Sequence, residues 1–333
     1  MTSRGDAAAA EGVSGAGKAL LVAATAVHSR RSCLLITYNR DQANRFVGDL
    51  EAFVGPPTDG TGSVLLFPPT ESVIYDGAVP DRHARAERLH VLDALCGEHA
   101  CIVVAPINAL LQHVVPPEDF AAMRRELRVG DTVDRDELGA TLLECGFRRT
   151  ELVDDVGQFS IRGGIVDVFS PTRVNPFRIE LFGDEVESIR EFDAESQRST
   201  APLGSISLSA AADVPLTRGL VEWALPTIRN ALQEQLSRLH GAEKPAEAER
   251  LRTKVGVDID RLDALDAVPG TDHYLPYLYP EPGTLADYLP DDAVVVIDEP
   301  IRLRTHAEQF HDEVRDAYDT AVARGELLAL PRL

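Results

Sequence analysis

The stretch Gly157–Thr200 reads GQFSIRGGIVDVFSPTRVNPFRIELFGDEVESIREFDAESQRST and contains two alternating strand patterns. Successive side chains of a strand point to opposite faces of the sheet. In the first pattern, Phe159 and Ile161 therefore point one way, whereas Ser160 and Arg162 point the other way. The apolar pair is expected to face a core, so that Arg162 is expected to face outward.

The second pattern covers residues 177–182. Its core face takes the apolar residues Phe177, Ile179 and Leu181. The opposite face takes Arg178, Glu180 and Phe182. Aromatic residues and arginines are enriched where protein partners dock, so this combination on one face indicates a protein-binding surface.

Contacts within the protein itself are an alternative to partner binding for these outward-facing residues. Arg162 and Arg178 can form ion pairs within the domain, with Asp167, Glu180 or Glu185 as partners. Phe182 can be covered by a neighbouring domain.

Composition limits the classes of function. The chain has 333 residues, of which 44% are hydrophobic and 26% charged, as in ordinary globular proteins. Its formal net charge of -21 repels phosphate backbones, which disfavours binding of DNA or RNA, although a local basic patch stays possible. No secretory signal or membrane-spanning run is recognisable, so we expect a cytoplasmic protein. The four cysteines are scattered without metal-ligand spacing, and no metal site is expected.

The order of the predicted elements indicates an α/β fold with an insertion. Strands and helices alternate up to about residue 127, which favours a parallel sheet with covered faces. Strands then dominate, and the apolar strand 293–297 near the end returns to the α/β style. We therefore predict three segments. Residues 1–127 begin an α/β domain, residues 128–210 form an inserted β-rich α+β domain, and residues 211–333 complete the first sheet.

Two further sequence segments resemble parts of a nucleotide-binding site. Gly12, Gly17 and Lys18 fit the pattern G-x-x-x-x-G-K, but Ala19 stands where a hydroxyl normally binds Mg²⁺. The strand ending in Asp298-Glu299 resembles the acidic strand end that holds a metal and orients water in ATPases. The sequence predicts a degenerate P-loop site that does not hydrolyse nucleotide. A weak nucleotide-binding or ATPase domain is the alternative.

The blocks SIRGGIVDVFSP and FRIELFGDEVESIREFDAESQRS resemble the inserted domain shared by bacterial transcription-repair coupling factors (Mfd) and the excision-repair protein UvrB. Flanking phrases such as LLFPPTESVIYDGAVPD and YLPYLYPEPGTLADYLPDDAVVVIDEP favour the coupling factors, and the resemblance runs from about Gly12 to Glu308. Relatives of UvrB carry an intact P-loop ending in Lys-Thr, in contrast to Lys18-Ala19 here.

The resemblance implies a partner and a set of contact residues. The amino-terminal module of this family mimics UvrB and docks UvrA. The family's UvrA-contacting positions correspond to Arg162, Arg178 and Phe182, and Glu180 on the same face is expected to orient the partner.

The resemblance also implies limits on activity. Whole coupling factors are ATP-dependent DNA translocases, but their motor and polymerase-contacting motifs are absent from these 333 residues. We therefore expect no cofactor here, since ATP and Mg²⁺ serve the motor domains. RNA polymerase and DNA are expected to be reached only through domains outside this chain, and no membrane contact is expected. From the residues alone, the question of an enzymatic activity stays open.

Overall fold

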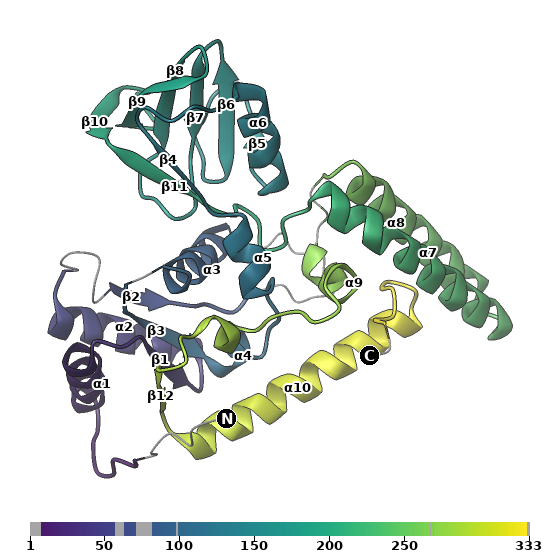
Figure 1. Ribbon diagram of the computed structural model, residues 1–333. Helices are drawn as coiled ribbons and strands as arrows, with labels where there is room; N and C mark the ends of the chain where they lie inside the picture. The colour runs from purple at the N-terminus through teal and green to yellow at the C-terminus, as the bar shows by residue number, and fades with distance from the viewer. Residues whose placement is uncertain are drawn as a thin grey trace.

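A computed structural model describes residues 8–56, 63–70, 82–97, 99–266, 268 and 270–331 (Figure 1). A parallel sheet with the strand order β12-β1-β3-β2 forms the first part of the molecule. Its strands are β1 (Cys33–Thr37), β2 (Ser63–Leu66), β3 (Cys101–Pro106) and β12 (Val294–Ile297). The last strand, β12, pairs with the first, β1, in parallel, and the predicted parallel sheet is confirmed.

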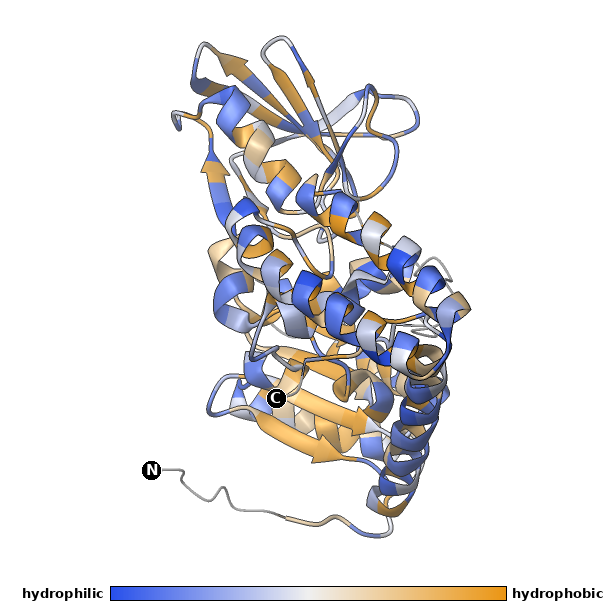
Figure 2. Ribbon diagram, turned by 90° about the vertical axis from the view of Figure 1, so that its right-hand side faces the viewer, coloured by the Kyte–Doolittle hydropathy of each residue, from blue (hydrophilic) through white to orange (hydrophobic). Residues whose placement is uncertain are grey.

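The central strands β1 and β3 are covered on both faces, because they are apolar on both sides. Cys33 and Leu35 pack toward α1 and α2, whereas Leu34 and Ile36 belong to the larger core on the opposite face. Figure 2 shows the strands as a hydrophobic layer. The helices of this part are α1 (Ala16–Ser29), α2 (Arg40–Val54), α3 (Arg82–Leu95), α4 (Ile107–Leu110) and α5 (Pro117–Ala122).

The larger core extends into a helical hairpin. Residues of α7 and α8 pack together and join the buried residues of α3 and β3 in one cluster. The elements after the insertion are α7 (Arg218–Gly241), α8 (Pro245–Asp263), η1 (Thr271–Tyr274), α9 (Leu275–Leu278), η2 (Leu285–Tyr288) and α10 (Pro300–Ala323). Helix α10 is an addition to the predicted elements. It contacts α4, and Leu303 and Ala307 pack partly against the core.

The inserted part, at the top of Figure 1, is a six-stranded sheet with the order β10-β9-β8-β7-β6-β5 and a separate two-stranded sheet. All pairs in the larger sheet are antiparallel except β5 with β6. The elements are β4 (Arg125–Arg128), α6 (Arg135–Glu144), β5 (Arg148–Arg149), β6 (Gln158–Arg162), β7 (Ile165–Val168), β8 (Phe177–Phe182), β9 (Glu185–Phe192), β10 (Ser199–Leu203) and β11 (Ser205–Leu208).

Helix α6 covers one face of the six-stranded sheet. Asp134 caps its start, because the carboxylate accepts hydrogen bonds from the backbone N–H groups of Asp136 and Glu137. Leu138 and Leu142 of this helix share a buried cluster with Phe159, Phe177 and Ile179. The predicted core face of β6 and β8 is therefore the face under α6. Among the described helices of the whole chain, none has the length and apolar character needed to span a membrane.

Candidate docking face on the inserted sheet

The face of the inserted sheet opposite α6 carries the predicted partner residues; we call it the outer face. The strand register places its side chains in three rows. The first row runs across four strands and contains Ser160, Asp167, Arg178 and Arg190. The second row contains Arg162, Ile165, Glu180 and Ser188. Phe182, opposite Glu185 at the end of the β8–β9 hairpin, forms the third.

Asp167 organises the two arginines. Its side chain is completely buried, and Arg178 binds it in a bidentate manner, with Nε 2.6 Å from Oδ1 and an Nη 2.9 Å from Oδ2. An Nη of Arg162 donates to the same Oδ2 at 2.8 Å. Charge-assisted bidentate pairs of this kind are among the stronger hydrogen bonds in proteins. The hydrogen bond to Asp167 raises the pKa of Arg178 above its ordinary value.

Burial differs between these two arginines. The side chain of Arg178 is only 17% exposed and its guanidinium lies 4.9 Å from the ring centroid of Phe192. The side chain of Arg162 is half exposed. The open alternative of an intradomain ion pair is therefore realised for both residues, with Asp167 as the shared partner, while Arg162 also presents donors to solvent.

Phe182 is the large apolar side chain of this face that stays in solvent, with 78% of its surface exposed. No neighbouring part of the described chain covers it, in contrast to the alternative left open by the sequence. Glu180, half-buried on the same strand, accepts a 2.6 Å hydrogen bond from the Ser188 hydroxyl. The structure thus brings all four predicted partner residues, Arg162, Arg178, Glu180 and Phe182, onto one face.

The turn between β6 and β7 needs two glycines. Gly163 has a φ of +61°, in the left-handed region that favours glycine. A Cβ on Gly164 would lie 2.6 Å from the carbonyl oxygen of Leu181, a contact too short for a real side chain. The Arg-Gly-Gly motif therefore lets this turn pass close to β8 and holds Arg162 at the edge of the outer face.

The lysine of the predicted degenerate nucleotide site contacts the acidic residues predicted for the same site. Lys18 lies in the first turn of α1, and its Nζ is 2.7 Å from both Asp298 Oδ1 and Glu299 Oε1. Desolvation lowers the pKa of Lys18, but the two hydrogen bonds outweigh it and raise the pKa above its ordinary value. The hydrogen bond from Lys18 lowers the pKa of Glu299. The lysine is thus engaged by the acidic strand end itself.

In the described part of that segment, from residue 8 onward, Gly12 lies in irregular chain and Gly17 in α1. Gly12 has a φ of +77°, and the residues from 8 to 14 are irregular up to the start of α1. Ala19 is fully buried against the α1–α2 side of the sheet, and a Cβ on Gly17 would lie 3.3 Å from a side-chain carbon of Val13. Within residues 8–14, which the structure describes, no strand leads into α1, whereas a strand precedes the loop of a P-loop that binds phosphate.

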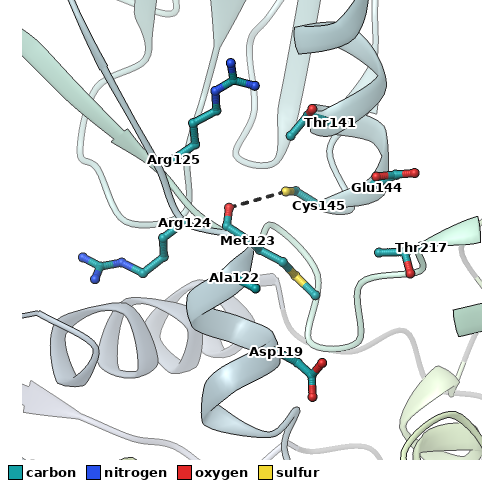
Figure 3. A pocket seen from close by; sticks show the side chains of 9 residues that line it. All are labelled: Asp119, Ala122, Met123, Arg124, Arg125, Thr141, Glu144, Cys145 and Thr217. Carbon is teal, nitrogen blue, oxygen red and sulfur yellow. Dashed lines mark hydrogen bonds between the residues drawn. The ribbon is translucent and has the colours of Figure 1, made fainter. Parts of the chain in front are cut away.

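One cavity of about 390 Å³ lies where the chain passes from α5 into the inserted part (Figure 3). Cys145 lines it, and its Sγ lies 3.9 Å from the carbonyl oxygen of Met123. Burial raises the pKa of the Cys145 thiol to about 11, which leaves it protonated and unreactive. None of the predicted site residues lines this cavity, so the outer face is the better candidate.

Comparison with known proteins finds similarity to one domain family and to several longer proteins. The UvrB interaction domain family matches residues 126–213, the part that carries the outer face. A transcription-repair-coupling factor of Bacillus subtilis is 33% identical over 317 residues, covering 95% of this chain and 26% of the relative. The predicted resemblance is confirmed. The chain matches the amino-terminal region of transcription-repair coupling factors.

Other coupling factors match over the same extent. That of Myxococcus xanthus is 32% identical over 336 residues, covering 96% of this chain and 26% of the relative. That of Staphylococcus haemolyticus is 29% identical over 319 residues, covering 94% and 26%. The chain thus spans about a quarter of the length of these coupling factors.

Sequence reasoning missed three members of the face, namely Ile165, Ser188 and Arg190. The signal for the last two was present, because Ser188, Arg190 and Phe192 alternate along β9 in the same way as the residues of β8.

Proposed function

We propose that this region is a non-catalytic adaptor of transcription-coupled nucleotide-excision repair, which binds UvrA through the outer face of the inserted sheet and thereby mimics UvrB. The match to the UvrB interaction domain, over residues 126–213, supports this function because it includes every residue of the outer face. The names of the similar coupling factors agree with a role in repair. In this proposal RNA polymerase and DNA are contacted only through domains that are absent from this chain.

The exposure of Phe182 is the observation on which the proposal mainly rests. A phenylalanine with 78% of its surface in water loses the benefit of burial in the free protein and regains it when a partner covers the ring. The neighbouring arginines supply directional hydrogen bonds. Apolar anchors beside arginines are the usual centres of protein interfaces.

The arginines act as a prepared pair. Asp167 fixes the Arg178 guanidinium in position, so that little side-chain freedom is lost when a partner binds. Arg162 has one bond to Asp167 and is half exposed, which leaves further N–H donors for partner carboxylates. Glu180 beside them restricts the orientation of the partner by its charge.

Substitution of Phe182 tests the proposed surface. Phe182→Ala is expected to weaken UvrA binding by about 2 kcal/mol, roughly thirtyfold, because it removes the apolar anchor. Its free energy of unfolding should change by less than about 0.5 kcal/mol, since the ring is exposed in the free protein. Titration of UvrA onto the immobilised chain measures the first quantity and urea unfolding the second.

Val174→Ala is the matched control. Val174 is 91% exposed and lies in the loop before β8, at the end of the strand away from Phe182. This variant should bind UvrA as the wild type does. Equal UvrA affinity of the Phe182→Ala variant and the wild type would refute the assigned surface.

The parallel-sheet part is proposed to be a degenerate NTPase-like domain that uses no cofactor. Lys18 is held by Asp298 and Glu299, and Ala19 offers no hydroxyl for Mg²⁺. These contacts support a structural role for the residues that imitate a nucleotide site. The proposed division into segments 1–127, 128–210 and 211–333 assigns this domain to the first and last segments.

A further inference from the structure

A third arginine, Arg190, lies on the outer face directly beside the pair described above. The register of β8 and β9 places Arg190 opposite Arg178, so that two guanidinium-bearing residues face each other across neighbouring strands. Side chains in such positions have Cβ atoms about 5 Å apart, and like charges there destabilise the sheet. The positive charge of Arg190 therefore lies at a position where it lowers the stability of the folded sheet.

The carboxylates around Arg190 are already engaged. Asp167 is bound by Arg162 and Arg178. The diagonal neighbour Glu180 accepts a hydrogen bond from Ser188. Among the described residues no hydrogen bond or ion pair holds the side chain of Arg190, which is exposed.

Glu191 does not compensate the charge either. It follows Arg190 on β9, so its side chain points to the opposite face of the sheet. There it accepts a 2.9 Å hydrogen bond from an Nη of Arg173. The outer face thus keeps one guanidinium with all of its donors available.

We propose that Arg190 is a further docking residue, which binds a carboxylate of the partner segment that covers Phe182. This inference rests on the proposed binding of UvrA and specifies its chemistry, namely an acidic segment of UvrA that crosses β8 and β9. One carboxylate meets Arg162 and Arg178, and a second meets Arg190. The second contact also relieves the repulsion between Arg178 and Arg190.

The charge of the whole chain favours a protein partner over nucleic acid at this face. The net charge is -21, and Glu180 and Glu185 lie within the outer face itself. A phosphate backbone would have to approach these carboxylates, whereas an acidic protein segment can place its few carboxylates at the arginines and apolar side chains at Phe182.

Binding of purified UvrA to four forms of the chain tests the inference. The forms are the wild type, Arg190→Ala, Arg190→Glu and Arg198→Glu. Arg198 is the matched control, because it is exposed in the turn between β9 and β10 and undergoes the same charge reversal. Arg190→Ala is expected to weaken binding about tenfold and Arg190→Glu more strongly, whereas Arg198→Glu should stay within about twofold.

Stability and salt dependence separate docking from a structural role. Removal of one arginine from the like-charged pair should leave the urea midpoint of Arg190→Ala unchanged or raised. A lowered midpoint that accounts for the weaker binding would overturn the inference. Wild-type affinity should also fall with salt more steeply than the affinity of Arg190→Glu.

The remaining outcomes distinguish this inference from the proposed function. Loss of binding in Phe182→Ala together with equal affinities of Arg190→Glu and Arg198→Glu would overturn the role of Arg190 and leave the docking face standing. Absence of binding by the wild type would overturn both. Binding of a short DNA duplex that Arg190→Glu abolishes, without any effect on UvrA, would assign the arginine to nucleic acid and also overturn the inference.

Discussion

Asp167 is the residue on which the outer face depends most. Its side chain has no exposure, yet it carries a charge that must be compensated inside the protein. Arg162 and Arg178 provide that compensation through three hydrogen bonds. The same carboxylate therefore stabilises the inserted sheet and positions the docking arginines.

Asp167→Asn should destabilise the chain strongly. The amide keeps the shape of the side chain but removes the charge that pairs with Arg178, and breaking a buried ion pair from one side costs about 3 kcal/mol. Urea unfolding measures the loss. Glu126→Gln is the control, because it removes an exposed ion pair with Arg128 and should change stability by less than about 1 kcal/mol. Equal stabilities of the two variants would contradict this role of Asp167.

Residue alternation predicted which face each side chain of the site takes, but not how deeply it is buried. Arg178 was expected to face outward, and it does so, yet its side chain is only 17% exposed because it bonds Asp167 and lies near the ring of Phe192. Such cover comes from contacts across several strands, which a pattern within one strand does not contain. Phe182 is exposed, as the alternation along β8 predicted, because no contact from another strand of the described chain covers its ring.

At the scale of elements, the strands and helices with strong apolar patterns were predicted well, and α10 was missed. The central parallel strands β1 and β3 are buried on both faces and therefore form short apolar runs. Helix α10 buries little, since Ala321 is its buried residue, and most of its side chains are polar. A helix that gains stability from so few core contacts leaves a weak apolar period in the sequence.

The segment after α10 is anchored by the helices that precede it. The Nε2 atom of His273, in η1, lies 2.8 Å from the carbonyl oxygen of Leu328. The side-chain amide of Gln235, in α7, donates a hydrogen bond to the carbonyl oxygen of Leu327. Desolvation lowers the pKa of His273, against the backbone hydrogen bond and Asp272, which act in the opposite direction. The neutral imidazole is thus the form that the fold accommodates.

Stability should therefore fall in mild acid. Because the pKa of His273 is lower in the folded chain than in the unfolded chain, the unfolded chain binds more protons below about pH 6.5. The contribution of His273 is fully present above that pH and decreases as the pH falls toward the folded-state pKa. Urea unfolding at several pH values between about 7.5 and 5.5 measures this slope.

His273→Gln should flatten that pH dependence, since the amide can donate to Leu328 without titrating. His311→Gln on the exposed side of α10 is the control and should keep the wild-type slope. An identical slope in wild type and His273→Gln would assign the acid sensitivity to other groups.

At the scale of the whole molecule, two parts with different chemistry are joined in one chain. The inserted sheet carries exposed, directional contacts on its outer face. The parallel-sheet part is an α/β structure in which Lys18 binds the acidic residues at the end of β12. The spacing of Gly12, Gly17 and Lys18 could be read from the sequence. The distance from Lys18 to Asp298 could not, because it depends on the pairing of β12 with β1.

The role of Lys18 distinguishes a structural lysine from a phosphate-binding one. The side chain of Asp298 is only 5% exposed, and loss of its ammonium partner would leave a buried charge. Lys18→Met should therefore lower the free energy of unfolding by about 1–3 kcal/mol, whereas Lys244→Met, at an exposed position before α8, should have little effect. Calorimetric titration with Mg-ATP should detect no binding to either the wild type or Lys18→Met. Tight Mg²⁺-dependent binding that Lys18→Met abolishes, with unchanged stability, would instead assign the lysine to a working nucleotide site.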